Sequence, residues 1–272
     1  MHPRTLTIAG SEVPTIGQGT WRMGEDPQRE VVALRAGIDL GLTLLDTAEM
    51  YAEGRAEQVV AEATRGRRDD VFIVSKVHPD NAATADTIRA CENSLSRLET
   101  DRIDLYLLHW RLDTPLEETI LAFDQLVSDG KIRAWGVSNF DIGDLDDLPD
   151  GNAPAADQIL YNLVTRGPEA ELMPRCADEG IAVMAYTPVD KGALLEHPIL
   201  AALAADRGVS PAQVALAWSI RDGNTVAIPK ALSLNHIEDN AAALDLDLTA
   251  EELAVLDGAF PAPGVVPLET GS

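Results

Sequence analysis

The chain has 272 residues, with 45 acidic against 21 basic side chains and a formal net charge of −24. A surface this negative repels nucleic acid and anionic membranes, so neither is an expected partner. The length exceeds that of most domains but suits an α/β barrel, which commonly reaches this size as one unit. Residues 1–272 are therefore expected to form a single domain.

The amino terminus, from Met1 to Leu6, lacks the apolar core of a signal peptide. No apolar run approaches the roughly 18 residues that a membrane-spanning helix needs. Cys91 and Cys176 lie in helical segments without ligand spacing, as is typical of free thiols in a reducing compartment. We therefore expect a cytoplasmic protein that is a monomer or a weak homo-oligomer.

Two explanations account for the acidic excess. One is adaptation to high salt, in which screening weakens the repulsion among carboxylates. The other is an ordinary Ala- and Arg-rich protein from a GC-rich genome. Lysine is scarce and occurs at Lys76, Lys131, Lys191 and Lys230.

Short apolar runs alternate with amphipathic segments along the chain. The runs are mostly continuously apolar, as in strands that are buried on both faces of a parallel sheet. A small hairpin is expected over 5–13, ahead of the first run. The predicted strands cover residues 15–17, 44–46, 71–76, 104–109, 134–137, 156–160, 182–186 and 225–228.

Helical periodicity falls between the strands, at residues 28–40, 84–98 and 116–128. Ser210 followed by Pro211 predicts the start of a helix that runs to residue 220. Thr249 and Glu252 have capping-box spacing and predict a closing helix over 249–260. Eight strand–helix units predict a closed (β/α)8 barrel. An open doubly wound sheet is disfavoured because no Gly-x-Gly-x-x-Gly follows the first strand.

Ionisable side chains terminate three consecutive predicted strands, namely Asp46, Lys76 and His109. Barrel enzymes place their sites at the carboxyl ends of the strands, so these residues are candidate catalytic groups. Tyr51 follows Asp46 closely enough to fold over the same mouth. A lysine ammonium beside a tyrosine lowers the pKa of the phenol, and a carboxylate keeps the ammonium charged. Tyr51 could then act as a general acid.

Three segments together resemble the aldo-keto reductase signatures: Asp46-Thr47-Ala48-Glu49-Met50-Tyr51, Ser75-Lys76-Val77 and Leu107-Leu108-His109-Trp110. The resemblance extends from Gly17 to about Phe260. It implies that Tyr51 is the general acid, that Lys76 and Asp46 tune it, and that His109 orients a substrate carbonyl. The implied reaction is hydride transfer from NADPH to a small aldehyde or ketone.

The resemblance also implies a cofactor site in the second half of the chain. Ser138, Asn139 and Gln158 match residues that hydrogen-bond the nicotinamide carboxamide, and Tyr186 matches the aromatic ring on which the nicotinamide stacks. The loop after Tyr186 would wrap the pyrophosphate, mainly through its backbone. The cofactor residues implied in these loops and after the first strand are Thr187, Val189, Gly19 and Thr20.

Ile228-Pro229-Lys230 resembles the family's adenosine phosphate site, with Asp239 and Asn240 at the positions that contact the adenine. Two residues depart from the pattern: Ala231 replaces a serine, and His236 replaces an arginine. A neutral histidine holds a phosphate less firmly than a guanidinium. We still expect NADPH as the cofactor, with NADH as a second one. The preference for NADPH over NADH should be weaker and more pH-sensitive than in typical members of the family.

Trp21 and Trp110 match aromatic residues that line the substrate pocket in the family. Short mouth loops and the short segment after Phe260 predict a shallow pocket for small or varied carbonyls. Within the family, the 46–51 motif is similar to that of methylglyoxal reductase-like members, which indicates small 2-oxoaldehydes as substrates. We expect His78 to be a loop residue and expect no metal site, because too few strand-end ligands surround it.

Two other functions fit the same sequence. One is a cofactor-binding regulatory subunit on the same fold. The presence of all four residues of the catalytic tetrad (Asp46, Tyr51, Lys76 and His109) disfavours this function but does not exclude it. The other is a metal-dependent barrel hydrolase that uses Asp46 and His109, which would require bound metal.

Overall fold

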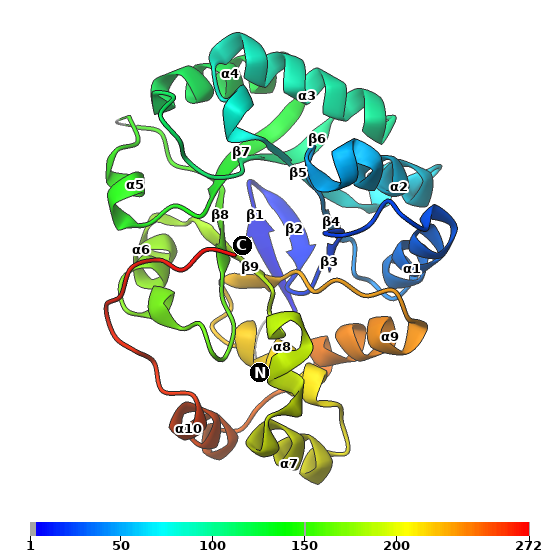
Figure 1. Ribbon diagram of the computed structural model, residues 1–272, viewed down its shortest axis with the longest axis vertical. Coiled ribbons are helices and arrows are strands. Elements are labelled where there is room, and N and C mark those ends of the chain that lie inside the picture. Colours follow the sequence, from blue (N-terminus) through cyan, green and yellow to red (C-terminus); the bar gives the residue numbers. More distant parts are fainter. Residues whose placement is uncertain (1–3, 150, 272) are drawn as a thin grey trace.

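The computed structural model describes residues 4–149 and 151–271. Eight parallel strands form one sheet in the order β10-β9-β8-β7-β6-β5-β4-β3, and the helices surround it (Figure 1). The strands are β3 (Gln18–Gly19), β4 (Leu44–Asp46), β5 (Phe72–Val77), β6 (Ile103–Leu108), β7 (Ile132–Ser138), β8 (Ala156–Leu160), β9 (Ala182–Tyr186) and β10 (Thr225–Ala227).

Backbone contacts between the first and last strands close the sheet into a barrel. Ile16 pairs with Ala227 in an isolated parallel bridge, and the Gly19 amide donates to the Pro229 carbonyl at 3.0 Å. A Cβ on Gly19 would lie 2.8 Å from the Ile228 oxygen, so this close approach requires glycine. The predicted (β/α)8 barrel is confirmed. The first strand lies slightly later than predicted, because its ladder with β4 forms at residues 18 and 19 rather than 15–17.

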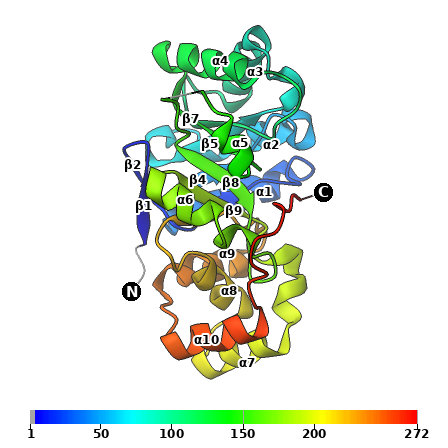
Figure 2. The ribbon, with the colours of Figure 1, turned by 90° about the vertical axis from the view of Figure 1, so that its left-hand side faces the viewer.

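The amino-terminal hairpin covers one end of the barrel. Strands β1 (Thr5–Ile8) and β2 (Ser11–Pro14) pair antiparallel, as the sequence predicts. Ile8 and Val13 are buried in one cluster with Leu44 and Phe72 of the barrel. The hairpin and the carboxyl terminus lie at opposite ends of the barrel axis (Figure 2).

Five of the ten helices in the described residues lie where the sequence predicts a helix. The segments 84–98 and 116–128 are helical over the predicted residues, and Ser210 and Thr249 both form capping boxes. No helix of the described residues is long and apolar enough to span a membrane. The helices are α1 (Pro27–Asp39), α2 (Arg55–Thr64), α3 (Thr84–Leu98), α4 (Leu116–Ser128), α5 (Ile142–Asp146), α6 (Leu172–Glu179), α7 (Pro198–Arg207), α8 (Pro211–Ser219), α9 (Leu234–Ala242) and α10 (Ala250–Ala259).

A buried arginine fastens the closing helix α10 to the loop that follows β8. The Arg166 side chain is 7% exposed and pairs with Asp257 at 2.8 Å and Glu169 at 2.7 Å. It also donates to the Phe260 carbonyl at 2.6 Å. Arg166 therefore fixes the point from which the carboxyl-terminal segment starts.

The segment after Phe260 runs back to the barrel mouth. Its Gly271 amide donates to the Tyr186 hydroxyl at 2.7 Å, at the carboxyl end of β9. Figure 1 shows this segment passing from α10 to the centre of the barrel. Although only a short stretch follows Phe260, it reaches the region where the sequence predicts an open, shallow pocket.

We expect Arg166→Leu to lower the free energy of unfolding by about 1.5–3 kcal/mol, because it removes a buried guanidinium that hydrogen-bonds the half-buried Glu169 and the Phe260 carbonyl. Urea denaturation measures this loss. The matched control is Arg89→Leu, which removes an exposed ion pair to Asp86 and should cost less than about 1 kcal/mol. Equal losses in the two variants would contradict the anchoring role.

Candidate active site

The sequence-predicted catalytic residues meet at the carboxyl ends of β4, β5 and β6. Asp46 is the last residue of β4, as predicted. Lys76 is the penultimate residue of β5, because the ladder with β6 continues to Val77, and His109 directly follows β6. These one-residue differences leave all three side chains at one end of the barrel.

A fully buried ammonium group is the centre of the site. Lys76 Nζ donates to Asp46 Oδ1 at 2.7 Å and to the Thr47 carbonyl at 2.8 Å. The side chain of Lys76 is 0% exposed. A buried ammonium is stable only when it is paired and hydrogen-bonded, and here Asp46 and Thr47 meet that requirement.

Tyr51 lies over this ammonium. It begins a short 3-10 turn (Tyr51–Gly54) directly after the loop from β4. The Lys76 ammonium donates to the Tyr51 hydroxyl oxygen at 3.3 Å and lies 4.9 Å from the centre of the phenol ring. The phenol ring meets the His109 imidazole edge-to-face at 5.7 Å. Tyr51 therefore contacts both Lys76 and His109.

Burial and charge act in opposite directions on this pair. Burial lowers the pKa of Lys76, but the Asp46 carboxylate raises it, and the net pKa is above the ordinary value of 10.5. Burial raises the pKa of Tyr51 above its ordinary value of 10.0, and the Lys76 ammonium offsets part of that rise. Lys76 is therefore charged and Tyr51 protonated at neutral pH. The lowered pKa that the neighbouring lysine predicts for Tyr51 is wrong, because burial outweighs the effect of the ammonium.

His109 is a neutral imidazole. Burial, followed by the repulsion of Lys76, lowers the pKa of His109 to about 2. Its Nδ1 is buried without a hydrogen-bond partner among the described residues. A neutral imidazole carries one N–H, which can be donated to an oxygen.

A hydrogen-bond chain joins this cluster to residues at the end of β7, within β8 and at the end of β9. Gln158 donates from Nε2 to Asp46 Oδ1 at 2.7 Å, and the Ser138 hydroxyl donates to the Gln158 carbonyl at 2.8 Å. Asn139, held at a φ of +60°, donates from Nδ2 to the His109 carbonyl at 3.1 Å. The Tyr186 hydroxyl donates to Asn139 Oδ1 at 2.8 Å. The two halves of the predicted site thus form one connected network.

The other predicted residues are distributed around the mouth. Thr20 is buried and donates its hydroxyl to the Asp46 carbonyl at 3.0 Å, so it supports the carboxylate. Trp110 packs between His109 and His78, with ring centres 4.9 Å from each. Asn240 is buried and Trp21 exposed. Lys230 and His236 are exposed, whereas Thr187, Val189 and Asp239 are half-buried.

Several supporting residues were not singled out from the sequence. Glu49 accepts the His78 amide at 2.6 Å and thereby ties the loop after β5 to the loop that carries Tyr51. Arg111 pairs with Asp144 and Asp147 of the α5 region, at 3.0 and 2.7 Å. No sequence signal distinguishes these residues from other charged surface positions. Only the fold brings their partners close.

Within residues 4–149 and 151–271, no group of three His, Cys, Asp or Glu side chains could hold a metal ion. His78 instead contacts Trp110 and accepts the Asp80 amide at Nδ1, at 3.2 Å. At this mouth an ammonium, a phenol and a neutral imidazole lie in contact with one another. The fold and the site together define a (β/α)8-barrel enzyme.

Comparison with known proteins identifies the family. Residues 15–260 match the aldo/keto reductase family. Methylglyoxal reductase YeaE of Escherichia coli is 49% identical over 275 residues, covering 97% of each chain. Glyoxal reductase of Bacillus subtilis is 33% identical over 250 residues, covering 91% of this chain and 89% of that one. The chain therefore belongs to the aldo/keto reductase family.

A solved structure agrees with this assignment. An aldo-keto reductase from Klebsiella pneumoniae, determined in complex with NADPH, is 50% identical and covers 100% of both chains with a TM-score of 0.96. The arrangement of strands and helices is therefore that of the family throughout its length.

The neutral state of His109 predicts how stability depends on pH. The unfolded chain takes up a proton on this histidine near pH 6.5, whereas the folded chain does not until about pH 2. The contribution of His109 to stability is thus fully present above pH 6.5 and is lost as the pH falls below it. In His109→Gln, the unfolding free energy measured in urea should fall less steeply between about pH 6.5 and 4.5. The difference should approach about 1.4 kcal/mol per pH unit. Parallel pH profiles for the two proteins would contradict a neutral His109.

Proposed function

We propose that this protein reduces small aldehydes and ketones to alcohols with NADPH, using Tyr51 as the general acid. The observation that carries the proposal is the position of the Lys76 ammonium, 2.7 Å from Asp46 and 3.3 Å from the Tyr51 hydroxyl. A clamped positive charge beside a phenol stabilises the phenolate that proton donation leaves behind.

NADPH, when bound, supplies the hydride that goes to the carbonyl carbon. Tyr51 gives its phenolic proton to the carbonyl oxygen, so that the product is a neutral alcohol and the tyrosine becomes a phenolate. Lys76 stabilises that phenolate, and Asp46 keeps the ammonium in place. His109, which is neutral, donates its N–H to the carbonyl oxygen and orients it. A proton from solvent then restores Tyr51.

The residues around the mouth have the chemistry to hold a nicotinamide dinucleotide. Asn139, Ser138 and Tyr186 supply amide and hydroxyl groups beside the tetrad. Thr187 has a buried Oγ1 without a partner among the described residues, at the end of β9 where a phosphate-bearing ligand would lie. NADPH is bound by the Klebsiella pneumoniae relative. Lys230 would supply positive charge for the adenosine phosphate.

Small 2-oxoaldehydes are the proposed substrate class. The Escherichia coli relative that is 49% identical is a methylglyoxal reductase. Trp110 lies beside His109, and the carboxyl-terminal segment reaches Tyr186, so a small, partly enclosed pocket would favour a compact substrate. A cofactor-binding regulatory subunit is the alternative function.

An aldehyde panel separates these two functions. With NADPH, we expect turnover of methylglyoxal and related 2-oxoaldehydes, measured as loss of nicotinamide absorbance, and slower turnover of bulky aromatic aldehydes and simple ketones. NADPH that binds but is oxidised by no member of the panel would support the regulatory subunit instead.

Tyr51→Phe should reduce kcat by roughly 10²- to 10⁴-fold, because it removes the proton donor. The dissociation constant for NADPH, measured by calorimetry, should stay within about twofold of wild type. The matched control is Tyr106→Phe, which removes a hydroxyl on the outer side of β6, where the ring packs against Phe123. Comparable kcat values for Tyr51→Phe and wild type would overturn the acid assignment.

A further inference from the structure

Most cations of this acidic chain are neutralised by a nearby carboxylate. Arginines on every side of the barrel form such pairs, for example Arg68 with Asp104 at 2.7 Å and Arg175 with Asp146 at 2.5 Å. Arg22, Arg29 and Lys230 differ, since none of them has an ion pair within the part of the chain that the structure describes. Cations without anionic partners are unexpected in a chain with 45 acidic residues.

The acidic residues next to Arg29 are already engaged elsewhere. Glu25 pairs with Arg55 at 2.8 Å, and Asp26 caps α1 through the backbone amide of Arg29. Glu30 is buried and accepts the Gly24 amide at 2.7 Å and the Asp26 amide at 3.3 Å. The Arg29 guanidinium therefore remains available to an anion from outside the chain.

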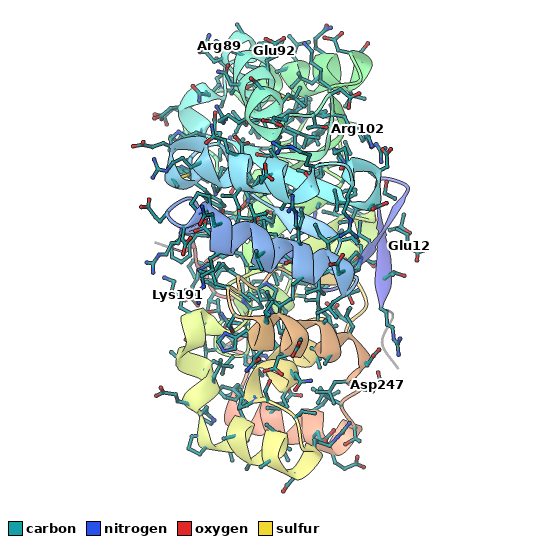
Figure 3. The ribbon with its side chains drawn as sticks, turned by 90° about the vertical axis from the view of Figure 1, so that its right-hand side faces the viewer. Glu12, Arg89, Glu92, Arg102, Lys191 and Asp247 are labelled. Carbon is teal, nitrogen blue, oxygen red and sulfur yellow. The ribbon has the colours of Figure 1, made fainter. Side chains whose placement is uncertain are left out.

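Arg29 and Lys230 lie at the same rim of the barrel. Arg29 is in the first turn of α1, and Lys230 lies between β10 and α9. Helices α1 and α9 pack side by side, and both begin at the mouth, because each follows a strand that ends there. In Figure 3 the blue helix α1 and the orange helix α9 lie next to each other, with Lys191 at the mouth and Glu12 of the hairpin at the opposite end.

The two cations are close enough to influence each other. Partial desolvation of the Lys230 ammonium lowers its pKa below the ordinary value of 10.5, and Glu30 opposes this shift. Repulsion from Arg29, and then from Arg22, lowers the pKa further. Like charges held together at a rim are stabilised when an anion binds between them.

We infer that Arg29, together with Lys230, binds the adenosine 2′-phosphate of NADPH and so determines the preference for NADPH over NADH. This inference rests on the proposed function. It assigns to α1 the guanidinium that the chain lacks at residue 236, where an exposed histidine stands in the first turn of α9. A guanidinium can hold a phosphate with two parallel hydrogen bonds, which a histidine does not offer.

Calorimetric binding of four ligands tests the assignment without measuring turnover. The ligands are NADPH, NADH, 2′,5′-ADP and 5′-AMP. Arg29→Gln should weaken NADPH and 2′,5′-ADP by about tenfold, the loss of one charge-assisted interaction, while NADH and 5′-AMP change by less than about twofold. Arg29→Lys keeps the positive charge but not the two parallel hydrogen bonds, so it should weaken NADPH binding less than Arg29→Gln does.

The matched control is Arg89→Gln, which removes the same charge from α3, where the arginine pairs with Asp86. Arg89→Gln should leave the affinities for all four ligands unchanged. The comparison separates the electrostatic effect of losing one positive charge from the loss of a direct contact with the phosphate. Equal weakening of NADPH and NADH by Arg29→Gln would overturn the inference, because it would place Arg29 at the pyrophosphate. Unchanged binding of every ligand would also overturn it.

A Lys230→Gln variant separates the role of Arg29 from the assignment of NADPH as the cofactor. If Lys230→Gln loses the NADPH preference and Arg29→Gln keeps it, the cofactor assignment stands and the role of Arg29 is refuted. If the wild-type protein binds neither dinucleotide, the proposed function itself fails.

Discussion

The site depends on a lysine ammonium that is held inside the barrel without contact with solvent. Burying such a charge costs several kcal/mol unless a close partner compensates for it. Asp46 supplies the compensation at 2.7 Å, and Gln158 and Thr20 in turn bind the side chain and the backbone of Asp46. The position of the carboxylate is therefore set by three separate strand ends. The position of the Tyr51 hydroxyl is fixed in turn, because its oxygen contacts the same ammonium.

The barrel converts neighbouring strands into a three-dimensional site because all of them end at one face. Residues that are 112 positions apart, Gln158 and Asp46, become hydrogen-bond partners across its interior. Asn139 links the same network to both His109 and Tyr186. A disturbance on the side of Tyr186 can therefore reach Tyr51 through a few hydrogen bonds, without any change in the strands themselves.

Periodicity and capping chemistry predicted the parts of the fold that depend on local sequence. The 84–98 and 116–128 helices, the N-cap at Ser210, the capping box at Thr249 and seven of the strand positions follow from residue types alone. The sequence predicts Asp46, Lys76 and His109 as site residues, because an ionisable residue at the end of an apolar strand is unusual. It does not predict the roles of Glu49, Arg111 and Arg166. Their partners lie far away in the chain, and a charged residue on a helix or loop is common. The direction of the pKa shift of Tyr51 could not be predicted from the sequence either, since it depends on how deeply the fold buries the ring.

The two ends of the polypeptide differ in what lies next to them. The Gly271 amide donates to the Tyr186 hydroxyl at the end of β9, whereas the hairpin that starts at Thr5 covers the other end of the barrel. Bulky groups attached next to Gly271 would lie beside Tyr186 at the mouth and crowd the entrance for small molecules. A tag fused ahead of the hairpin would begin on the opposite side, which makes the amino terminus the better place for purification handles and for surface immobilisation.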